Sequence, residues 1–274
     1  VKALSSLSVQ VRVLSGDSAS VVRSTCSRLG IPAESVITGS MLSEMTESEA
    51  LAQIGQTRVF AELAPAQKAD IVDMIRLSGH AVGYIGDGVN DVPALMAADV
   101  GIVVDSAAAE SKKVADLVLL ERDLGVVAEG VREGRKAFAN ASKYIRIASS
   151  SNFGNICSVA AASAFLPFLP ATAAQLLVLN LSFDAVCLAI PWDNVDAEEV
   201  GSPKTWSGKG LGGFMGRFGL VSSAFDIITF AILFFGVCPA VCGAPFSALD
   251  EAGRALFVAL FQAGWLLECA WTES

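Results

Sequence analysis

Hydrophobic positions in the first half of the chain form short strand-like runs that alternate with helical stretches. Val9–Leu14 alternates apolar and polar residues, as a half-buried strand does. Ser18–Leu29 has helical periodicity and stops at Gly30. The same patterns predict further strands over Arg58–Leu63, Ala81–Ile85 and Val100–Val104, and a helix from Pro65 to Gly79. This order indicates an α/β domain with a parallel sheet, whose chemistry lies beyond the carboxyl ends of its strands.

The second half of the chain is dominated by long apolar stretches. A helical pattern begins at about Leu124 and continues into the first of them, so we expect a stalk that leads into a membrane. The predicted spans are 145–166, 173–192, 214–237 and 256–271. The last is only 16 residues long, whereas a membrane helix needs about 20, so we expect it to be truncated. The pattern thus predicts two domains, 1–143 and 144–274.

Charge and composition agree with a multi-pass membrane protein. The net charge is −9, which argues against a nucleic-acid partner because such proteins carry a basic face. Basic residues lie before the first span and in the 193–213 loop, so we expect residues 1–143 to be cytoplasmic, in a plasma or bacterial inner membrane whose lipids contact the spans. The chain begins at Val1 without a signal peptide, and both ends look cut. The six cysteines form no CxxC pair, and Cys238 with Cys242 fits either two free thiols or a bridge.

The candidate chemistry of the first half centres on Gly86-Asp87-Gly88-Val89-Asn90-Asp91, directly after a predicted strand. The glycines permit a sharp turn close to a ligand. Asp87 and Asp91 are close enough to share a cation, and Mg²⁺ favours one or two carboxylates together with phosphate oxygens. Asn90 adds an amide donor. An ordinary Gly/Asp/Asn turn is the alternative, although the apolar strand before the loop disfavours it.

Two other segments fit the same phosphate site. Ser15-Gly16-Asp17 places a hydroxyl and a glycine amide beyond the first strand, although it is also a common turn. Lys68, in the first turn of the Pro65 helix, can neutralise phosphate charge during transfer. Taken alone, it is more readily interpreted as a solvated surface lysine.

These three motifs, in this order and spacing, resemble the haloacid-dehalogenase-type phosphorylation domain of P-type ATPases. The resemblance implies a partial α/β haloacid-dehalogenase-like domain, a Rossmannoid parallel sheet, followed by an all-α transmembrane helical bundle. It implies that Asp87 binds the catalytic Mg²⁺ with support from Asp91 and Asn90. Lys68 and Ser15 would stabilise the phosphoryl group that ATP donates, with Ser15 replacing the family's threonine.

The chain lacks the DKTGT motif that carries the family's phosphorylated aspartate. We therefore expect a fragment that is inactive alone and needs the N-terminal part of the same polypeptide as its partner.

Polar residues within the predicted spans suggest an ion path. Asn152 and Asn155 share one helix face, as do Asn180 and Asp184. Together they offer hard oxygen ligands for a divalent cation. The alternative is that the amides only form hydrogen bonds between helices. Glu268 is a further candidate. Asp226 could serve in the ion path too, but we expect it to lie nearer the cytoplasmic end of its span and to be hydrated.

The second half also resembles membrane helices five to eight of magnesium-transporting P-type ATPases. The matching segments are Ser150–Asn155, Ser163–Pro170, Asn180–Asp184, Pro191–Asp193, Phe225–Ala231 and Phe261–Glu268. This resemblance implies ATP-driven Mg²⁺ movement into the cytoplasm. A calcium or other cation pump is the alternative, but Asn155 stands where calcium pumps of the family place an acid.

Two other functions are alternatives to a pump, and His80 is considered as a possible catalytic residue. A membrane-tethered phosphatase would have a nearby nucleophilic aspartate and no polar face in its spans, so Asn180 and Asp184 count against it. A non-catalytic remnant is compatible with the missing DKTGT motif. His80 lies between Gly79 and a strand with no evident partner, so we expect a structural or solvent-facing role for it.

Overall fold

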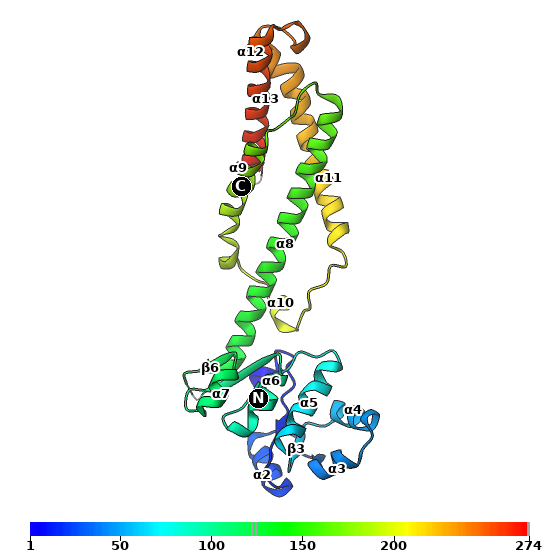
Figure 1. Cartoon of the computed structure of the whole chain (residues 1–274), viewed down its shortest axis with the longest axis vertical. Helices are drawn as coiled ribbons and strands as arrows, with labels where there is room; N and C mark the ends of the chain where they lie inside the picture. The colour runs from blue at the N-terminus through cyan, green and yellow to red at the C-terminus, as the bar shows by residue number, and fades with distance from the viewer. Residues whose placement is uncertain (122, 124, 273–274) are drawn as a thin grey trace. The chain divides into compact units, whose positions relative to one another are not determined.

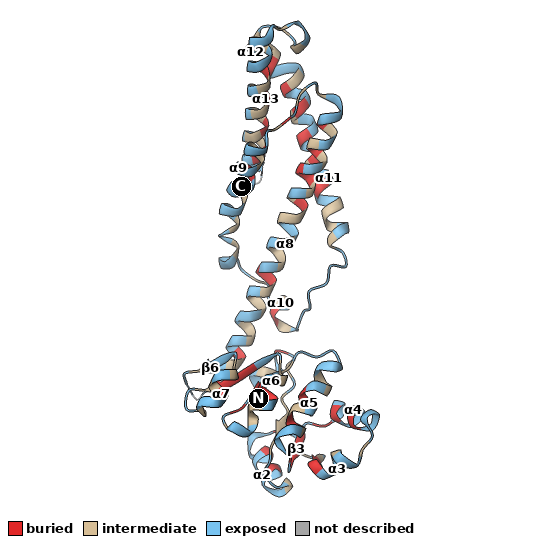
Figure 2. Ribbon diagram, viewed as in Figure 1, coloured by how far each residue is buried: buried red, intermediate tan, exposed pale blue. Residues whose placement is uncertain are grey.

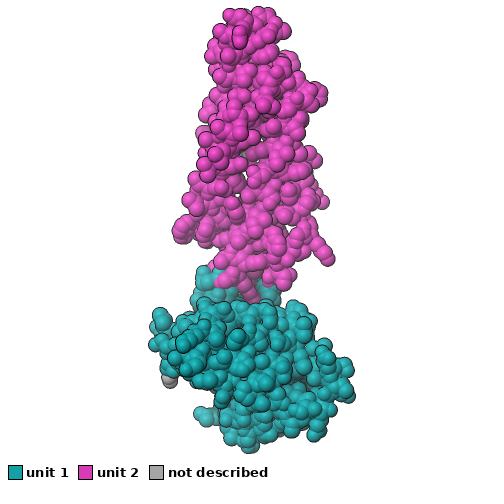
Figure 3. All heavy atoms as spheres, in the orientation of Figure 1, with its two compact units in different colours: residues 1–133, 201–203 teal, residues 134–200, 204–274 magenta. Residues whose placement is uncertain are grey.

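The computed structural model describes residues 1–121, 123 and 125–272, and it divides into two compact units (Figure 3). Unit 1 is Val1–Glu133 with Gly201–Pro203, and unit 2 is Gly134–Val200 with Lys204–Ser274. The predicted start of the stalk, Leu124, lies outside the described residues. The helix that follows, α8, is described from Gly125 to Phe165.

The strands of unit 1 form two parallel sheets, as the alternation of strands and helices predicts. Among the described residues, one sheet has the order β1-β3-β2 and the other the order β4-β5-β6. Val13 pairs with Val59 in the first, and Ile102 pairs with Leu117 in the second. The strands are β1 (Val13–Leu14), β2 (Val36–Thr38), β3 (Val59–Ala61), β4 (Gly83–Ile85), β5 (Val100–Val104) and β6 (Leu117–Leu119).

The helices of unit 1 begin and end at recognisable signals. Ser18 is the N-cap of α2, and Gly30 ends it with a φ of 68°. Thr46 and Glu49 form a capping box at the start of α4. Pro65 occupies the first turn of α5. The helices are α1 (Lys2–Ser5), α2 (Ala19–Leu29), α3 (Gly39–Glu44), α4 (Glu47–Gln56), α5 (Pro65–Leu77), η1 (Val89–Asp91), α6 (Val92–Ala97) and α7 (Ala109–Val114) (Figure 1).

The core of unit 1 packs residues of both sheets against α5. Strand β3 is fully buried, as expected for a parallel strand covered on both faces. Ile71 of α5 packs in the same cluster as Phe60 of β3, and Val72 packs in the same cluster as Tyr84 of β4. Leu14 of β1 packs against both clusters. Helix α5 therefore links the two sheets.

Unit 2 consists of helices. After α8 come α9 (Ala173–Cys187), η2 (Ile190–Trp192), α10 (Ala197–Gly201), α11 (Leu211–Ile232), a π-helical turn labelled η3 (Leu233–Val237), α12 (Cys238–Cys242), η4 (Phe246–Ala248) and α13 (Glu251–Thr272). Among the described residues, three helical segments are long and apolar enough to cross a membrane: Ala173–Trp192, Leu211–Cys242 and Glu251–Thr272.

Three predicted spans differ from these segments. The third was predicted at 214–237, whereas its helical segment is Leu211–Cys242. Helix α8 is not among the three segments, because its run of serines and asparagines lowers its hydropathy, so a crossing at 145–166 stays a prediction. The last helix was predicted to be short, but it begins at Glu251 and is 22 residues long. Its first turn contains Glu251 and Arg254, which is why the apolar pattern alone placed its start too late.

Aromatic side chains form the core of unit 2. Phe257, Phe261 and Trp265 of α13 pack with Phe230 of α11, while most of α9 is exposed (Figure 2). Gly219 of α11 lies so close to α8 that a Cβ there would be 3.0 Å from the Ser150 carbonyl oxygen. All six cysteines lie within the described residues and none of them forms a disulfide there, so Cys238 and Cys242 are not bridged.

Candidate active site and ion path

The loop after β4 is folded by its glycines and by contacts from α7. A Cβ on Gly86 would lie 2.6 Å from the Asp91 Cβ, so only glycine lets the loop close this tightly. The Asp91 amide donates to the Gly88 carbonyl at 3.0 Å. Ser111, which is fully buried, donates its hydroxyl to the same carbonyl at 2.8 Å. The loop is therefore a defined turn with Asp87 and Asn90 exposed on it.

Lys68 and Asp91 form the central ion pair of the predicted phosphate site. Lys68 Nζ lies 2.7 Å from Asp91 Oδ1, and both side chains are largely buried. The Tyr84 hydroxyl donates to the same oxygen at 2.9 Å. Burial acts to raise the pKa of the Asp91 carboxyl, but the hydrogen bonds from Lys68 and Tyr84 outweigh it and hold that pKa below its ordinary value. Burial and the charge of Asp91 raise the pKa of the Tyr84 phenol, which keeps it a proton donor.

The second predicted element, Ser15-Gly16-Asp17, is a turn beyond β1. The Ser15 hydroxyl donates to Asp17 Oδ2, and the Asp17 amide donates to the Ser15 oxygen, each at 3.1 Å. The Ser15 carbonyl accepts from the Leu63 amide at 3.1 Å, which ties the turn to the segment after β3. Ser15 and Asp17 are both solvent-accessible, so a phosphoryl oxygen could reach the hydroxyl.

The donor set of this region fits magnesium. Asp87 is an exposed carboxylate, and Asp91 keeps one oxygen outside its bond with Lys68. Carboxylate oxygens together with phosphate oxygens and water are the ligands that Mg²⁺ prefers. The tight turn at Gly86 brings the backbone of both aspartates into one loop, as the sequence predicts.

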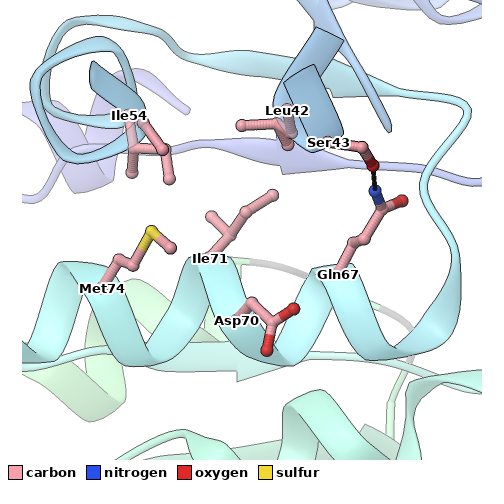
Figure 4. A pocket seen from close by; sticks show the side chains of 8 residues that line it. Leu42, Ser43, Ile54, Gln67, Asp70, Ile71 and Met74 are labelled. Atoms are coloured by element: carbon pink, nitrogen blue, oxygen red, sulfur yellow. Dashed lines mark hydrogen bonds between the residues drawn. The ribbon is translucent and has the colours of Figure 1, made fainter. Parts of the chain in front are cut away.

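A surface pocket of about 170 Å³ lies apart from this site, between α3, α4 and α5 (Figure 4). Gln67 spans its edge, donating to the Ser43 hydroxyl at 3.1 Å and to the Gly39 carbonyl at 2.8 Å. None of the predicted phosphate-site residues lines it. Helix α5 thus presents Lys68 to Asp91 and Gln67 to this pocket.

The predicted ion-path residues differ in their environment. Asn155 of α8 is buried, whereas Asn152, Asn180 and Asp184 are exposed in this chain. Asp184 accepts a hydrogen bond from the Tyr144 hydroxyl at 3.2 Å. Glu268 is partly buried on α13.

Asp226 was predicted to be hydrated, and this is wrong: its exposed fraction is 3%. The helix continues to Cys242, so Asp226 is near its middle. Trp265 Nε1 donates to its Oδ1 at 2.9 Å, and Ser158 Oγ lies 2.5 Å from its Oδ2. Ligand atoms of Asp226, Glu268 and Cys269 lie within 4.8 Å of one another. A buried carboxylate thus joins α8, α11 and α13.

Five of the contacting residues escaped the sequence analysis: Tyr84, Ser111, Tyr144, Ser158 and Trp265. Tyr84 occupies an inward position two residues before Gly86, and this strand periodicity could have indicated it. Ser111, Ser158 and Trp265 come from elements distant in sequence, and no local pattern pairs them with Gly88 and Asp226. Tyr144 lies at the predicted junction of stalk and span, where an aromatic residue suggests only an interface anchor.

Models of the haloacid dehalogenase-like hydrolases match residues 1–99 and 69–131. Over 98% of its length the chain is 43% identical to a P-type magnesium-transporting ATPase of Salmonella typhimurium. It is 44% identical over 97% of its length to a P-type magnesium-transporting ATPase of Escherichia coli. An endoplasmic reticulum calcium ATPase of Aspergillus fumigatus is 31% identical over 68% of the chain. The chain spans only 28% of the two magnesium-transporting relatives and 20% of the calcium ATPase.

Proposed function

We propose that this chain, which belongs to the P-type ATPases, supplies the phosphate-handling loops and four of the membrane helices of a magnesium pump. The observation that carries the proposal is the Lys68–Asp91 pair at the carboxyl edge of a parallel sheet, in one chain with apolar helices that hold a buried carboxylate. The ion pair suits phosphoryl transfer, and the helices suit transport. The 43% identity to a magnesium-transporting relative supports magnesium over calcium.

The phosphorylated residue would come from another part of the parent polypeptide. Among the described strands, β1 and β4 each pair on one side only. Both pack against the same helix, α5, because Leu14 of β1 and Tyr84 of β4 lie in one cluster with Val72. A parallel strand inserted between them would place its carboxyl end beside Ser15 and Asp87. We infer that the upstream part of the parent supplies this strand and, beyond it, the nucleophilic aspartate.

At that edge the residues of this chain would take distinct roles. Lys68 neutralises phosphoryl charge, and Asp91 holds Lys68 in place. Ser15 and the Gly16 amide bond phosphoryl oxygens, with Asp17 orienting the Ser15 hydroxyl. Asp87, with Asn90 and Asp91, would hold Mg²⁺, which supplies charge neutralisation for the ATP phosphates.

For transport, the ion path would be built from Asn152, Asn155, Asn180, Asp184 and Glu268. These residues offer amide and carboxylate oxygens with few charges, which suits an ion that keeps much of its water. Basic residues flank the first predicted span on the side of unit 1, which supports a cytoplasmic position for residues 1–143. These residues are Arg132, Arg135, Lys136, Lys143 and Arg146.

The test uses the complete protein in a bacterial strain that lacks its own magnesium transporters. We expect Asp87→Asn to reduce phosphoenzyme turnover by about 10²-fold or more and Asp184→Asn to reduce Mg²⁺ uptake at least about tenfold. Asp70→Asn, an exposed carboxylate on α5, serves as the matched control. Unchanged Mg²⁺ uptake by both variants would overturn the proposed function.

A further inference from the structure

Tyr144 of α8 makes a direct contact with the predicted ion ligand Asp184. Its hydroxyl donates to Asp184 Oδ1 at 3.2 Å, across 40 residues of sequence. Tyrosine can donate one proton, and an ionised carboxylate accepts through both oxygens. One lone pair of Oδ1 is therefore engaged, and Oδ2 is the less hindered oxygen for a cation.

Neighbouring residues of α8 hold this contact in place. Lys143 Nζ lies 2.7 Å from Asp193 Oδ2 and donates to the Asn194 carbonyl at 2.9 Å. Asn140, which is buried, donates to the Asp193 carbonyl at 3.2 Å. These bonds tie one stretch of α8 to the segment that follows α9. The hydrogen bonds of Asn140 and Lys143 thus fix the part of α8 from which Tyr144 reaches Asp184.

The two candidate ions make different demands on such a carboxylate. Ca²⁺ takes six to eight oxygen ligands in a flexible geometry and accepts carboxylates through both oxygens. Mg²⁺ requires a near-ideal octahedron with short bonds, retains several waters, and uses a carboxylate through one oxygen. An aspartate whose second oxygen is hydrogen-bonded to a tyrosine meets the demand of Mg²⁺ better than that of Ca²⁺.

We propose that Tyr144 is a specificity-determining residue that restricts Asp184 to ligation through one oxygen and so favours Mg²⁺ over Ca²⁺. This inference rests on the proposed function, in which Asp184 belongs to the ion path. Asn180, one turn before Asp184 on α9, offers a single amide oxygen on the same face.

The experiment compares Tyr144→Phe with the wild-type complete protein in membrane vesicles, using ATP hydrolysis stimulated by Mg²⁺ or Ca²⁺ at the transport site. We expect the apparent affinity for Ca²⁺ relative to Mg²⁺ to rise about tenfold, the effect of about one hydrogen bond, while the maximal Mg²⁺-stimulated rate is retained. Ser163→Ala removes an exposed hydroxyl from the same helix and should leave the ratio unchanged. The amount of phosphoenzyme formed in each sample measures the amount of folded pump, and the rates are normalised to it.

The outcomes separate this inference from the proposed function. If Asp184→Asn abolishes Mg²⁺ uptake and Tyr144→Phe leaves the affinity ratio within about twofold of wild type, the role of Tyr144 is overturned and the pump stands. If Asp184→Asn leaves Mg²⁺ uptake unchanged, the ion path itself is overturned. A raised ratio in Tyr144→Phe together with loss of uptake in Asp184→Asn supports both.

Discussion

The two units each bury a carboxylate, and they satisfy it in opposite ways. In unit 1, Asp91 meets the cation of Lys68 and the hydroxyl of Tyr84. In unit 2, Asp226 meets the neutral donors of Ser158 and Trp265. Paired charges offset each other inside a protein, whereas a charge held by neutral donors in an apolar setting depends on hydrogen bonds alone.

This difference separates a site that handles charge from one that joins helices. Removing one member of the Lys68–Asp91 pair leaves an uncompensated charge beside a phosphate, so activity should suffer first. Removing the Asp226 carboxylate leaves a buried donor without an acceptor, so stability should suffer first. Variants of Lys68 and Asp226 test whether the first site affects mainly activity and the second mainly stability.

The largest effect is expected for Lys68→Met. It removes the cation that neutralises phosphoryl charge and leaves Asp91 unpaired, and we expect phosphoenzyme formation by the complete protein to slow by about 10³-fold. The measurement is incorporation of labelled phosphate from ATP. Lys113→Met, an exposed lysine on α7, is the control. A rate within about threefold of wild type would show that Lys68 pairs with Asp91 without acting on the phosphoryl group.

A smaller effect, on stability, is expected for Asp226→Ala. Trp265 loses its buried acceptor at about 1–3 kcal/mol, while Ser158 keeps the Gly154 carbonyl as an acceptor, so the complete protein should unfold at a lower temperature in detergent. Asp226→Asn should be milder, because its amide can donate to Ser158 Oγ while Ser158 donates to the Gly154 carbonyl 2.9 Å away. Asp196→Ala is the exposed control. If Asp226→Ala and Asp226→Asn lowered the unfolding temperature equally, the hydrogen-bonding role would be contradicted and the effect would be assigned to the lost carboxylate charge.

The smallest effect is expected for Ser111→Ala. It deletes the hydroxyl that holds the Gly88 carbonyl, at a cost of about 1 kcal/mol, and loosens the loop that carries Asp87. Denaturant unfolding and the Mg²⁺ dependence of phosphoenzyme formation measure the two consequences. Ser27→Ala on the exposed side of α2 is the comparison, and an equal response of the two variants would exclude a specific role for Ser111.

The sequence was most informative where local patterns decide structure. The bounds of β5 and the caps of α2 and α5 follow from residues within a few positions of each other. The strands β2 and β6 were missed, because neither segment shows the alternation of apolar and polar residues that indicated β1. Local hydropathy also placed the start of α13 too late.

Prediction of the site was limited by long-range contacts. The motif at Gly86–Asp91 and the segment Pro65–Lys68 were each visible in the sequence. Only the family resemblance favoured the phosphate site over a surface position for Lys68. Asp226 was misjudged because its depth depends on where its helix ends and on donors from α8 and α13. Such contacts join residues 39 and 68 positions away, which no short-range pattern encodes.

The π-helical turn at Leu233–Val237 changes which positions of this helix face inward. Asp226, Phe230 and Leu233 are buried at helical spacing, and an uninterrupted α-helix would next bury Val237. Instead Val237 is 45% exposed and Cys238 is fully buried. One additional residue in the turn has moved the inward stripe forward by one position. The buried positions before and after the turn therefore lie on one face of the helix, although their spacing in the sequence is one residue longer than in an uninterrupted α-helix. Aligning related chains here by a fixed helical repeat would pair lipid-facing with core-facing residues.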